Sequence, residues 1–244
     1  MIVFGINPVL EALRAGHVVK LLVSDRDDAR LREVLAVAAA GGVAVEQVPR
    51  DVLTHASRRG LHQGVVAEVQ APRAYDVSEL VTAGAGIPLI VVLDGVEDPH
   101  NVGAILRTCD AAGVTGVVRQ TRRAAALGGA AAKASAGAMA HVRVADAVNI
   151  ARALADLKAA GVWTVGLAGD AARAYDEVDY TVPTAFVVGA EGTGLRRLVR
   201  EHCDWLVSLP MAGHVESLNV SVAAGVVLYE AVRQRRRGAP VPGR

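Results

Sequence analysis

Several residue types are scarce in this chain of 244 residues, and each shortage excludes a class of protein. Aromatic residues make up 3% of the sequence, too few for a platform on which nucleic-acid bases stack. The two cysteines, Cys109 and Cys203, lack metal-ligand spacing and lie in apolar-periodic segments, as small core residues of a reduced protein do. Residues 1–20 carry no signal peptide, and no apolar run is long enough to cross a bilayer. We therefore expect a cytoplasmic protein with no metal and no membrane partner.

An excess of positive charge is also missing, since 26 Lys and Arg residues face 25 Asp and Glu residues, for a net charge of +1. A protein that binds nucleic acid by charge alone should be more basic, so any RNA contact must come from local patches. Lysine occurs only at Lys20, Lys133 and Lys158. The positive charge is thus almost all arginine, which favours bidentate phosphate contacts, although a high-GC genome would give the same bias.

What the sequence does contain is an alternation of short apolar strands and helices, typical of an α/β fold with a largely parallel sheet. Residues 1–70 predict a small domain of the pattern βαβαβαβ, with Asn7 capping its first helix. Residues 71–87 are expected to be a linker and lead-in, 88–237 a second α/β domain, and 238–244 a flexible tail. The second domain is expected to have strands near 88–93, 115–118, 162–167, 185–188 and 205–209, and helices near 101–112, 130–138, 147–160, 195–202 and 219–236. The last of these helices is apolar all round, which predicts packing against a partner subunit as well as its own domain.

The stretch 93–114 reads as the end of a strand, a polar loop and the start of a helix, with Asn101 as the expected N-cap. Open α/β sheets bind ligands at such junctions. Arg107 lies off the apolar stripe of this helix, over Gly103, so open space for a phosphate or sugar is expected there. The ordinary alternative is a surface arginine paired with Asp110.

Two further stretches lie at the ends of predicted strands. Residues 188–195 form a glycine-rich turn that permits close approach of a ligand or another backbone, but the spacing is not that of a dinucleotide fingerprint, and Glu191 would repel a pyrophosphate. In residues 208–221, Ser217 or Asn219 can cap the final helix. His214 is expected to be ordinary polar surface.

Taken in order, these stretches resemble the three motifs of the SpoU/TrmH branch of the SPOUT RNA 2′-O-methyltransferases. The matching segments are N-x-G-x-x-x-R at 101–107, GAEG at 189–192 and SLN at 217–219. Residues 4–13 and 62–67 resemble the RNA-binding domain of the RlmB-like subgroup, which methylates a guanosine of 23S ribosomal RNA.

The resemblance implies a C-terminal SPOUT domain with a parallel sheet and a deep trefoil knot, preceded by a small α/β RNA-binding domain similar to certain ribosomal proteins. It also implies a homodimer, RNA as substrate, and S-adenosylmethionine as cofactor. The cofactor-binding residues that it implies are Gly189, Ala190, Gly192, Leu209, Met211 and Leu218. The catalytic residues that it implies are Arg107, Asn101, Glu191, Ser217 and Asn219, with Arg107 at the 2′-hydroxyl and Glu191 fixing the cofactor loop or pairing with Arg107. Candidate phosphate contacts are Arg14, Arg58, Arg59, Arg122 and Arg123.

Three alternatives remain open at this point. The same chemistry could act on transfer RNA or on a ribosomal site that confers antibiotic resistance. The chain could instead be an RNA-binding protein without catalysis, which the presence of Arg107, Glu191 and Asn219 disfavours. A nicotinamide dehydrogenase is the least favoured, because the glycine pattern and its position are wrong.

Overall fold

A computed structural model describes residues 2–26, 28–70, 73, 75–84, 86–121, 125, 127 and 130–237. The chain divides into two compact units. The first contains Met1–Pro72 and also takes in Val102–Arg107 and Ala126–His141, whereas the second contains Arg73–Asn101, Thr108–Ala125 and Val142–Arg244. Each unit is built around its own sheet.

The N-terminal sheet has the strand order β1-β4-β2-β3. Its elements are β1 (Ile2–Phe4), α1 (Ile6–Arg14), β2 (Val18–Val23), α2 (Ala29–Ala40), β3 (Ala44–Gln47), α3 (Arg50–Ala56) and β4 (Val65–Val69). β4 runs antiparallel to both β1 and β2, and β2 pairs with β3 in parallel. Leu21, Leu31 and Val65 belong to the buried cluster between this sheet and helices α1 and α2.

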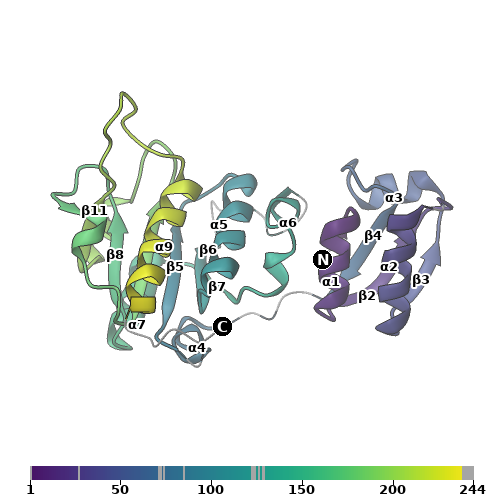
Figure 1. The fold of residues 1–244 in the computed structure, drawn as a ribbon, viewed down its shortest axis with the longest axis horizontal. Helices are drawn as coiled ribbons and strands as arrows, with labels where there is room; N and C mark the ends of the chain where they lie inside the picture. The colour runs from purple at the N-terminus through teal and green to yellow at the C-terminus, as the bar shows by residue number, and fades with distance from the viewer. Residues whose placement is uncertain are drawn as a thin grey trace. The chain divides into compact units, whose positions relative to one another are not determined.

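The C-terminal sheet has seven strands in the order β7-β6-β5-β10-β8-β11-β9, and every neighbouring pair is parallel (Figure 1). The strands are β5 (Leu89–Asp94), β6 (Gly116–Gln120), β7 (Val144–Ala147), β8 (Trp163–Leu167), β9 (Arg173–Ala174), β10 (Thr184–Gly189) and β11 (Trp205–Ser208). The helices are α4 (Val77–Thr82), α5 (Pro99–Ala112), α6 (Ala130–Ala134), α7 (Ile150–Ala159), α8 (Arg197–His202) and α9 (Val220–Arg237), with 3-10 turns at Ala138–Ala140 and Tyr175–Glu177.

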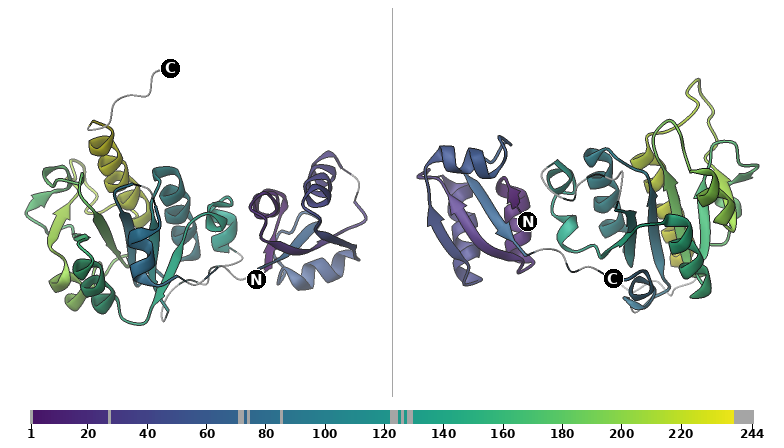
Figure 2. Two further views of the ribbon diagram at one scale, coloured as in Figure 1. Left: turned by 90° about the horizontal axis from the view of Figure 1, so that it is seen from below. Right: turned by 180° about the vertical axis from the view of Figure 1, so that it is seen from behind.

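Helices cover both faces of this sheet, which is why its central strands are continuous apolar runs rather than alternating ones. All six residues of β5 are buried. Leu80 of α4, Leu154 of α7 and Val199 of α8 share one buried cluster with alternate residues of β5 and β10. Helices α5 and α9 lie over the opposite face, in front of the strands in Figure 1 and on the far side from α7 in Figure 2.

The structure corrects several boundaries expected from the sequence. Asp98 caps α5 by accepting from the His100 N–H at 2.9 Å, so the helix starts at Pro99, and Asn101 is not its cap. Helix α1 likewise starts before Asn7, at Ile6. Strands β7 and β9 and helix α4 are absent from the sequence prediction, because each is short and β7 (VADA) lacks a bulky apolar run. None of the described helices is long and apolar enough to cross a membrane.

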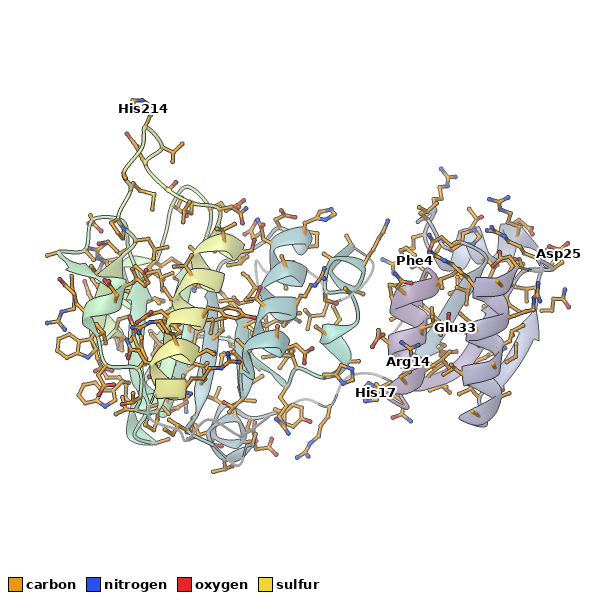
Figure 3. The ribbon with its side chains drawn as sticks, viewed as in Figure 1. Phe4, Arg14, His17, Asp25, Glu33 and His214 are labelled. Atoms are coloured by element: carbon orange, nitrogen blue, oxygen red, sulfur yellow. The ribbon has the colours of Figure 1, made fainter. Side chains whose placement is uncertain are left out.

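Arg14, a candidate phosphate contact, lies on the exposed side of α1 and is already paired. Its guanidinium donates to Glu11 at 2.9 Å and to Glu33 of α2 at 3.1 Å (Figure 3). The pairs hold α1 and α2 together at the surface, and exposed pairs of this kind contribute at most about 1 kcal/mol. A phosphate would have to compete with two carboxylates for Arg14, which weakens its candidacy.

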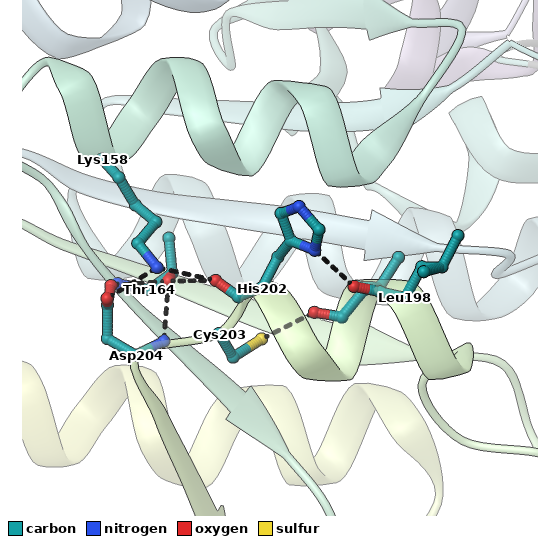
Figure 4. Close-up of polar contacts among 7 residues, drawn as sticks. Lys158, Thr164, Leu198, His202, Cys203 and Asp204 are labelled. Atoms are coloured by element: carbon teal, nitrogen blue, oxygen red, sulfur yellow. Dashed lines mark hydrogen bonds and ion pairs between the residues drawn. The ribbon is translucent and has the colours of Figure 1, made fainter.

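A polar cluster around Asp204 ties α7, β8 and the turn before β11 together (Figure 4). The Asp204 carboxylate accepts from the Thr164 N–H at 2.9 Å and the Thr164 hydroxyl at 2.7 Å, and it pairs with Lys158 at 2.8 Å. Burial alone would raise the pKa of Asp204, but the hydrogen bonds from Lys158 and Thr164 outweigh it and hold the pKa below its usual range. The ionised carboxylate is therefore part of the folded state.

Replacing Asp204 by Asn should lower the free energy of unfolding at neutral pH by about 1–3 kcal/mol, because a charged acceptor is lost. Because the carboxylate has a lower pKa in the folded state than its unfolded-state value of about 4, ionisation stabilises the fold above that pH. This stabilisation is lost as the pH falls below about 4 and through the folded-state pKa. The D204N variant should therefore lose less stability than the parent on acidification. Denaturant titrations followed by tryptophan fluorescence report on this region directly, since Trp163 and Trp205 flank the cluster and stack at 6.3 Å. The control is D156N, which replaces an exposed aspartate on α7. An equal loss of unfolding free energy in D204N and D156N would contradict the account.

Candidate active site

The carboxyl ends of four neighbouring parallel strands, β5, β10, β8 and β11, meet at one edge of the C-terminal sheet. Gly189 of β10 lies opposite Asp94 of β5 in the register, so the loops that follow these two strands begin side by side. The loops after β8 and β11 leave the same edge, and the loop after β11 stands out from the domain with His214 at its tip (Figure 3). Such an edge is where open α/β sheets bind ligands.

Three polar side chains from distant parts of the sequence form one hydrogen-bonded ring at this edge. Asn101, in the first turn of α5, donates to Glu191 Oε1 at 2.7 Å. Asn219 donates to the same oxygen at 2.8 Å and to Asn101 Oδ1 at 3.0 Å. Glu191 therefore accepts from both amides, and the stretches around residues 101, 191 and 219 are held together.

Asn219 has a second role as the cap of α9. Its Oδ1 accepts from the Ser221 N–H at 2.9 Å and from the Ser221 hydroxyl at 2.6 Å. The prediction that Ser217 or Asn219 caps the last helix is thus confirmed for Asn219. Because Oδ1 accepts hydrogen bonds from Ser221 at the start of the helix, the amide nitrogen of Asn219 points toward Glu191 and Asn101.

The glycine-rich stretch after β10 is a tight, closed turn. Ala190 and Gly194 exchange backbone hydrogen bonds at 3.2 and 2.9 Å, and Gly192 and Gly194 adopt left-handed conformations. A Cβ at position 189 would lie 2.2 Å from the Gly194 carbonyl carbon. Only glycine fits at 189, because the turn folds back onto the end of its own strand.

A buried ion pair anchors the far end of this turn. Asp94 is fully buried at the end of β5, and it accepts from the Arg196 backbone N–H at 2.9 Å and from Arg196 Nε at 2.7 Å. A third bond comes from Arg196 Nη2. Among the described residues, all hydrogen bonds to the Asp94 carboxylate come from Arg196, and the pair links the end of β5 to the start of α8.

Beside the ring lies a cavity of about 520 Å³, a volume typical of sites for small molecules. All six residues that the family resemblance implies for the cofactor line it, namely Gly189, Ala190, Gly192, Leu209, Met211 and Leu218. Glu191, Ser217 and Asn219 line it too. Residues 167–170, at the end of β8, and Arg200 complete the wall, and the sequence analysis did not predict them. The glycine of the segment LAGD, at the end of a strand, is the signal that could have indicated residues 167–170.

Comparison with known proteins gives a consistent result over the whole chain. Residues 88–229 match the SpoU rRNA Methylase family, and residues 2–75 match the family of RNA 2′-O ribose methyltransferase substrate-binding domains. The chain belongs to the SpoU rRNA methylase family.

Relatives of both kinds, by sequence and by structure, cover nearly the full length. The Yersinia pestis 23S rRNA (guanosine-2′-O-)-methyltransferase RlmB is 44% identical over 96% of this chain and 97% of its own. A Mycolicibacterium smegmatis protein described as an uncharacterized tRNA/rRNA methyltransferase is 47% identical over 96% of this chain and 77% of its own. The structure of the SpoU methyltransferase AviRb from Streptomyces viridochromogenes in complex with AdoMet has a TM-score of 0.83 at 28% identity, covering 98% of this chain and 91% of that one.

This SpoU methylase is therefore an S-adenosylmethionine-dependent RNA 2′-O-methyltransferase, and the cavity fits the cofactor. Its wall combines apolar side chains, such as Leu167, Leu209 and Met211, with the polar backbone of the glycine turn. That mixture suits a ligand with an apolar purine and a charged amino-acid end. Asp170 and Arg200 also line it and pair with each other at 2.8 and 3.0 Å, and hydrogen bonding to Arg200 holds the pKa of Asp170 below its usual range. The described residues contain no group of three or more His, Cys, Asp or Glu that could hold a metal ion.

The surroundings of Arg107 differ from the sequence prediction. A Cβ on Gly103 would lie 2.5 Å from the Ala134 Cβ, so α6 packs directly on α5 and the open space expected over Gly103 is not there. Arg107 itself is exposed, and among the described residues it pairs neither with Asp110 nor with Glu191. Within the chain, Glu191 is bonded to the two asparagines instead. Arg122 and Arg123 lie outside the described residues.

Removing the Arg196 side chain should destabilise the domain by about 2–3 kcal/mol, because it leaves the buried Asp94 carboxylate with a single backbone donor. The R196A variant should also bind S-adenosylmethionine more weakly, since the glycine turn loses its anchor. Denaturant unfolding and calorimetric titration measure the two effects. The neighbouring R197A, which removes only an exposed pair with Glu201, should change stability by less than about 0.5 kcal/mol. Equal effects of the two variants would show that the Asp94 pair is not an anchor.

Proposed function

We propose that this enzyme methylates the ribose 2′-hydroxyl of a guanosine in 23S ribosomal RNA. The observation that carries the proposal is the ring of Asn101, Glu191 and Asn219 beside the cofactor-sized cavity, which unites the three family motifs in one place. The substrate assignment is supported by the near full-length similarity to relatives named as 23S rRNA guanosine-2′-O-methyltransferases. Action on ribosomal RNA in the cytoplasm is part of the same proposal.

The chemistry requires a ribose oxygen to form a bond to a methyl carbon while the carbon–sulfur bond opposite it breaks, with loss of the hydroxyl proton. S-adenosylmethionine, when bound, supplies that methyl group on a positively charged sulfur. The ring around Glu191 fixes the glycine turn and the first turn of α5, and Ser217 and Asn219 help to position the nucleotide. The cavity residues Gly189, Ala190, Gly192, Leu209, Met211 and Leu218 hold the cofactor.

Arg107 is assigned to the reacting nucleotide. Its guanidinium is exposed and unpaired among the described residues, so it is free to engage RNA. A guanidinium keeps its proton throughout the physiological pH range, so Arg107 is a poor proton acceptor. Its role is therefore to hold the phosphate and hydroxyl in line and to stabilise charge that develops on the ribose oxygen, with the proton passing to phosphate or water.

Replacing Arg107 by Ala should lower kcat for methyl transfer by about 100- to 1000-fold, the usual cost of removing one donor to a developing oxyanion. The dissociation constant for S-adenosylmethionine should stay within about threefold of the parent, because Arg107 does not line the cavity. Transfer of labelled methyl to 23S ribosomal RNA from a strain lacking the gene measures the first quantity, and calorimetry the second. The exposed R152A on α7 is the control, and retained turnover in R107A would overturn the assigned role.

The same transfer assay tests the substrate. Label at one guanosine of 23S ribosomal RNA supports the proposal, whereas label in transfer RNA would keep the chemistry and overturn the substrate. A site that confers antibiotic resistance would show as label at a different ribosomal nucleotide. Absence of both cofactor binding and label, with RNA present, would indicate an RNA-binding protein without catalysis.

A homodimer formed through α9 belongs to the proposal. Val227, Leu228 and Ala231 of α9 are fully buried against their own domain, while Val222 and Tyr229 are each 51% exposed. A helix with apolar side chains on both sides fits a second subunit on the exposed side. The trefoil knot and the domain limits 1–70 and 88–237 are proposed on the family resemblance.

The V222D variant should convert the dimer to a monomer, because a carboxylate would be buried without a partner at the subunit interface. Sedimentation velocity of the full chain measures the change in mass. The matched control V148D alters a valine that is 72% exposed elsewhere in the same domain, and it should leave the dimer intact. A monomeric parent protein, or a dimeric V222D, would contradict the assignment of this interface.

A further inference from the structure

The N-terminal sheet carries a hollow of about 770 Å³ that the methyl-transfer site does not use. It is lined by residues 24–26, which follow β2, by Arg50 and Thr54 of α3, and by the turn 59–64 that leads into β4. Among the described residues that line it are three arginines, Arg26, Arg50 and Arg59, and one acidic residue, Asp25. We call it the arginine hollow.

Two of its three arginines are not in an ion pair with any described residue. Arg26 pairs with Asp28 at 2.5 Å, but the side chains of Arg50 and Arg59 have no ion-pair partner among the described residues. His62 adds no charge. Burial, and then the nearby Arg50, lower the pKa of its imidazole. Its ring is fixed between the Gly64 N–H at 3.1 Å and the Thr54 hydroxyl at 3.3 Å, which suits the neutral form. Two free guanidinium groups around one hollow favour an anionic ligand such as a phosphate.

A buried hydroxyl without a partner also belongs to the wall. Ser24 is 7% exposed and lines the hollow, and its Oγ has no hydrogen-bond partner among the described residues. Buried polar groups nearly always have a hydrogen-bond partner, so a buried hydroxyl without one at the wall of a hollow indicates a ligand that bonds to it. Gly64 keeps the position open, because a Cβ there would lie 2.8 Å from Ser24 Oγ.

The backbone around the hollow is held in an uncommon shape. Arg58, Arg59 and Gln63 all have left-handed conformations, with φ of 51°, 64° and 53°. Such conformations cost free energy for residues other than glycine and persist where the surroundings enforce them. Gln63 is fixed by its Oε1, which accepts from the Ile6 N–H at 3.1 Å. The turn thus presents Arg59 from a defined position.

We propose that the arginine hollow binds one nucleotide of an unpaired RNA segment, with its phosphate against Arg50 and Arg59 and its sugar or base edge bonded to Ser24. A hydroxyl is both donor and acceptor, which suits a ribose 2′-hydroxyl or a base edge. No Phe, Tyr or Trp is among the described residues that line the hollow, so recognition is assigned to hydrogen bonds and charge. The proposal rests on the proposed function in that RNA is the substrate, and it assigns a second contact to that RNA.

The test compares full-length variants in the methyl-transfer assay with 23S ribosomal RNA as the probe. R50A/R59A should raise KM for RNA by about 10- to 100-fold, since two charge-assisted contacts are lost, while kcat stays within about twofold. The dissociation constant for S-adenosylmethionine should not change. The control R30A/R32A removes two exposed arginines from α2 of the same domain, outside the hollow, and should raise KM by less than about threefold.

S24A separates a ligand contact from a structural role. Because the Ser24 hydroxyl bonds to none of the described residues, its removal should leave the thermal stability unchanged or slightly higher, yet raise KM for RNA several-fold. A 2′-hydroxyl acylation footprint of the RNA should also lose protection at one nucleotide, distant from the methylated guanosine, in both S24A and R50A/R59A. Equal changes of the KM for RNA in R50A/R59A and in the control R30A/R32A, or an unchanged KM in S24A, would overturn the proposal.

Failure of the proposed function can be told apart from failure of this inference. If the parent protein transfers no methyl group to 23S ribosomal RNA, filter binding of the same RNA by the same variants still tests the hollow. If methyl transfer occurs and the hollow variants behave like the control, the enzyme assignment stands and the hollow is not an RNA site.

Discussion

The carboxylate of Glu191 is the point on which the catalytic domain depends. One of its oxygens accepts from Asn101 and from Asn219, which lie 90 residues before it and 28 residues after it. Asn101 lies in the first turn of α5, after β5, and Asn219 precedes α9, after β11, so the two amides come from segments that follow different strands. Without an acceptor at 191, the buried Asn101 amide and the exposed Asn219 amide would lose their common partner, and the glycine turn would lose its attachment to α5 and α9.

The parallel sheet makes this meeting possible. Because β5, β10, β8 and β11 all run in the same direction, the loops that follow them converge on one edge of the sheet. Residues that are far apart in the sequence can therefore lie side by side at this edge. The Asp94–Arg196 pair holds the other end of the glycine turn, so the turn is fixed at both ends before any ligand binds. Preorganisation of this kind allows binding free energy to go into orienting the nucleotide and cofactor.

Much of this arrangement could be predicted from the sequence, because it rests on local patterns. Apolar runs marked the central strands, glycine spacing marked the turn after β10, and Asn219 before an apolar helix marked a cap. The position of Asp98 as the α5 cap was missed because Asn101 is an equally good capping residue. The contact of α6 with Gly103 and the Asp94–Arg196 pair depend on tertiary packing between segments about 30 and 100 residues apart, which no local pattern encodes. Hydrophobic periodicity likewise cannot predict what Arg107 binds, since no group among the described residues pairs with it.

The central claim is that Asn101, Glu191 and Asn219 act as one unit, and a set of single and double substitutions tests it most directly. The measurement is kcat/KM for methyl transfer by N101A, N219A, E191A and the double variants E191A/N101A and E191A/N219A. If Glu191 is the common acceptor, each double variant should lose less activity than the product of its two single losses, because the bond from that asparagine to Glu191 is already broken in E191A. Multiplicative losses in the double variants would show that the three residues act independently and would contradict the account.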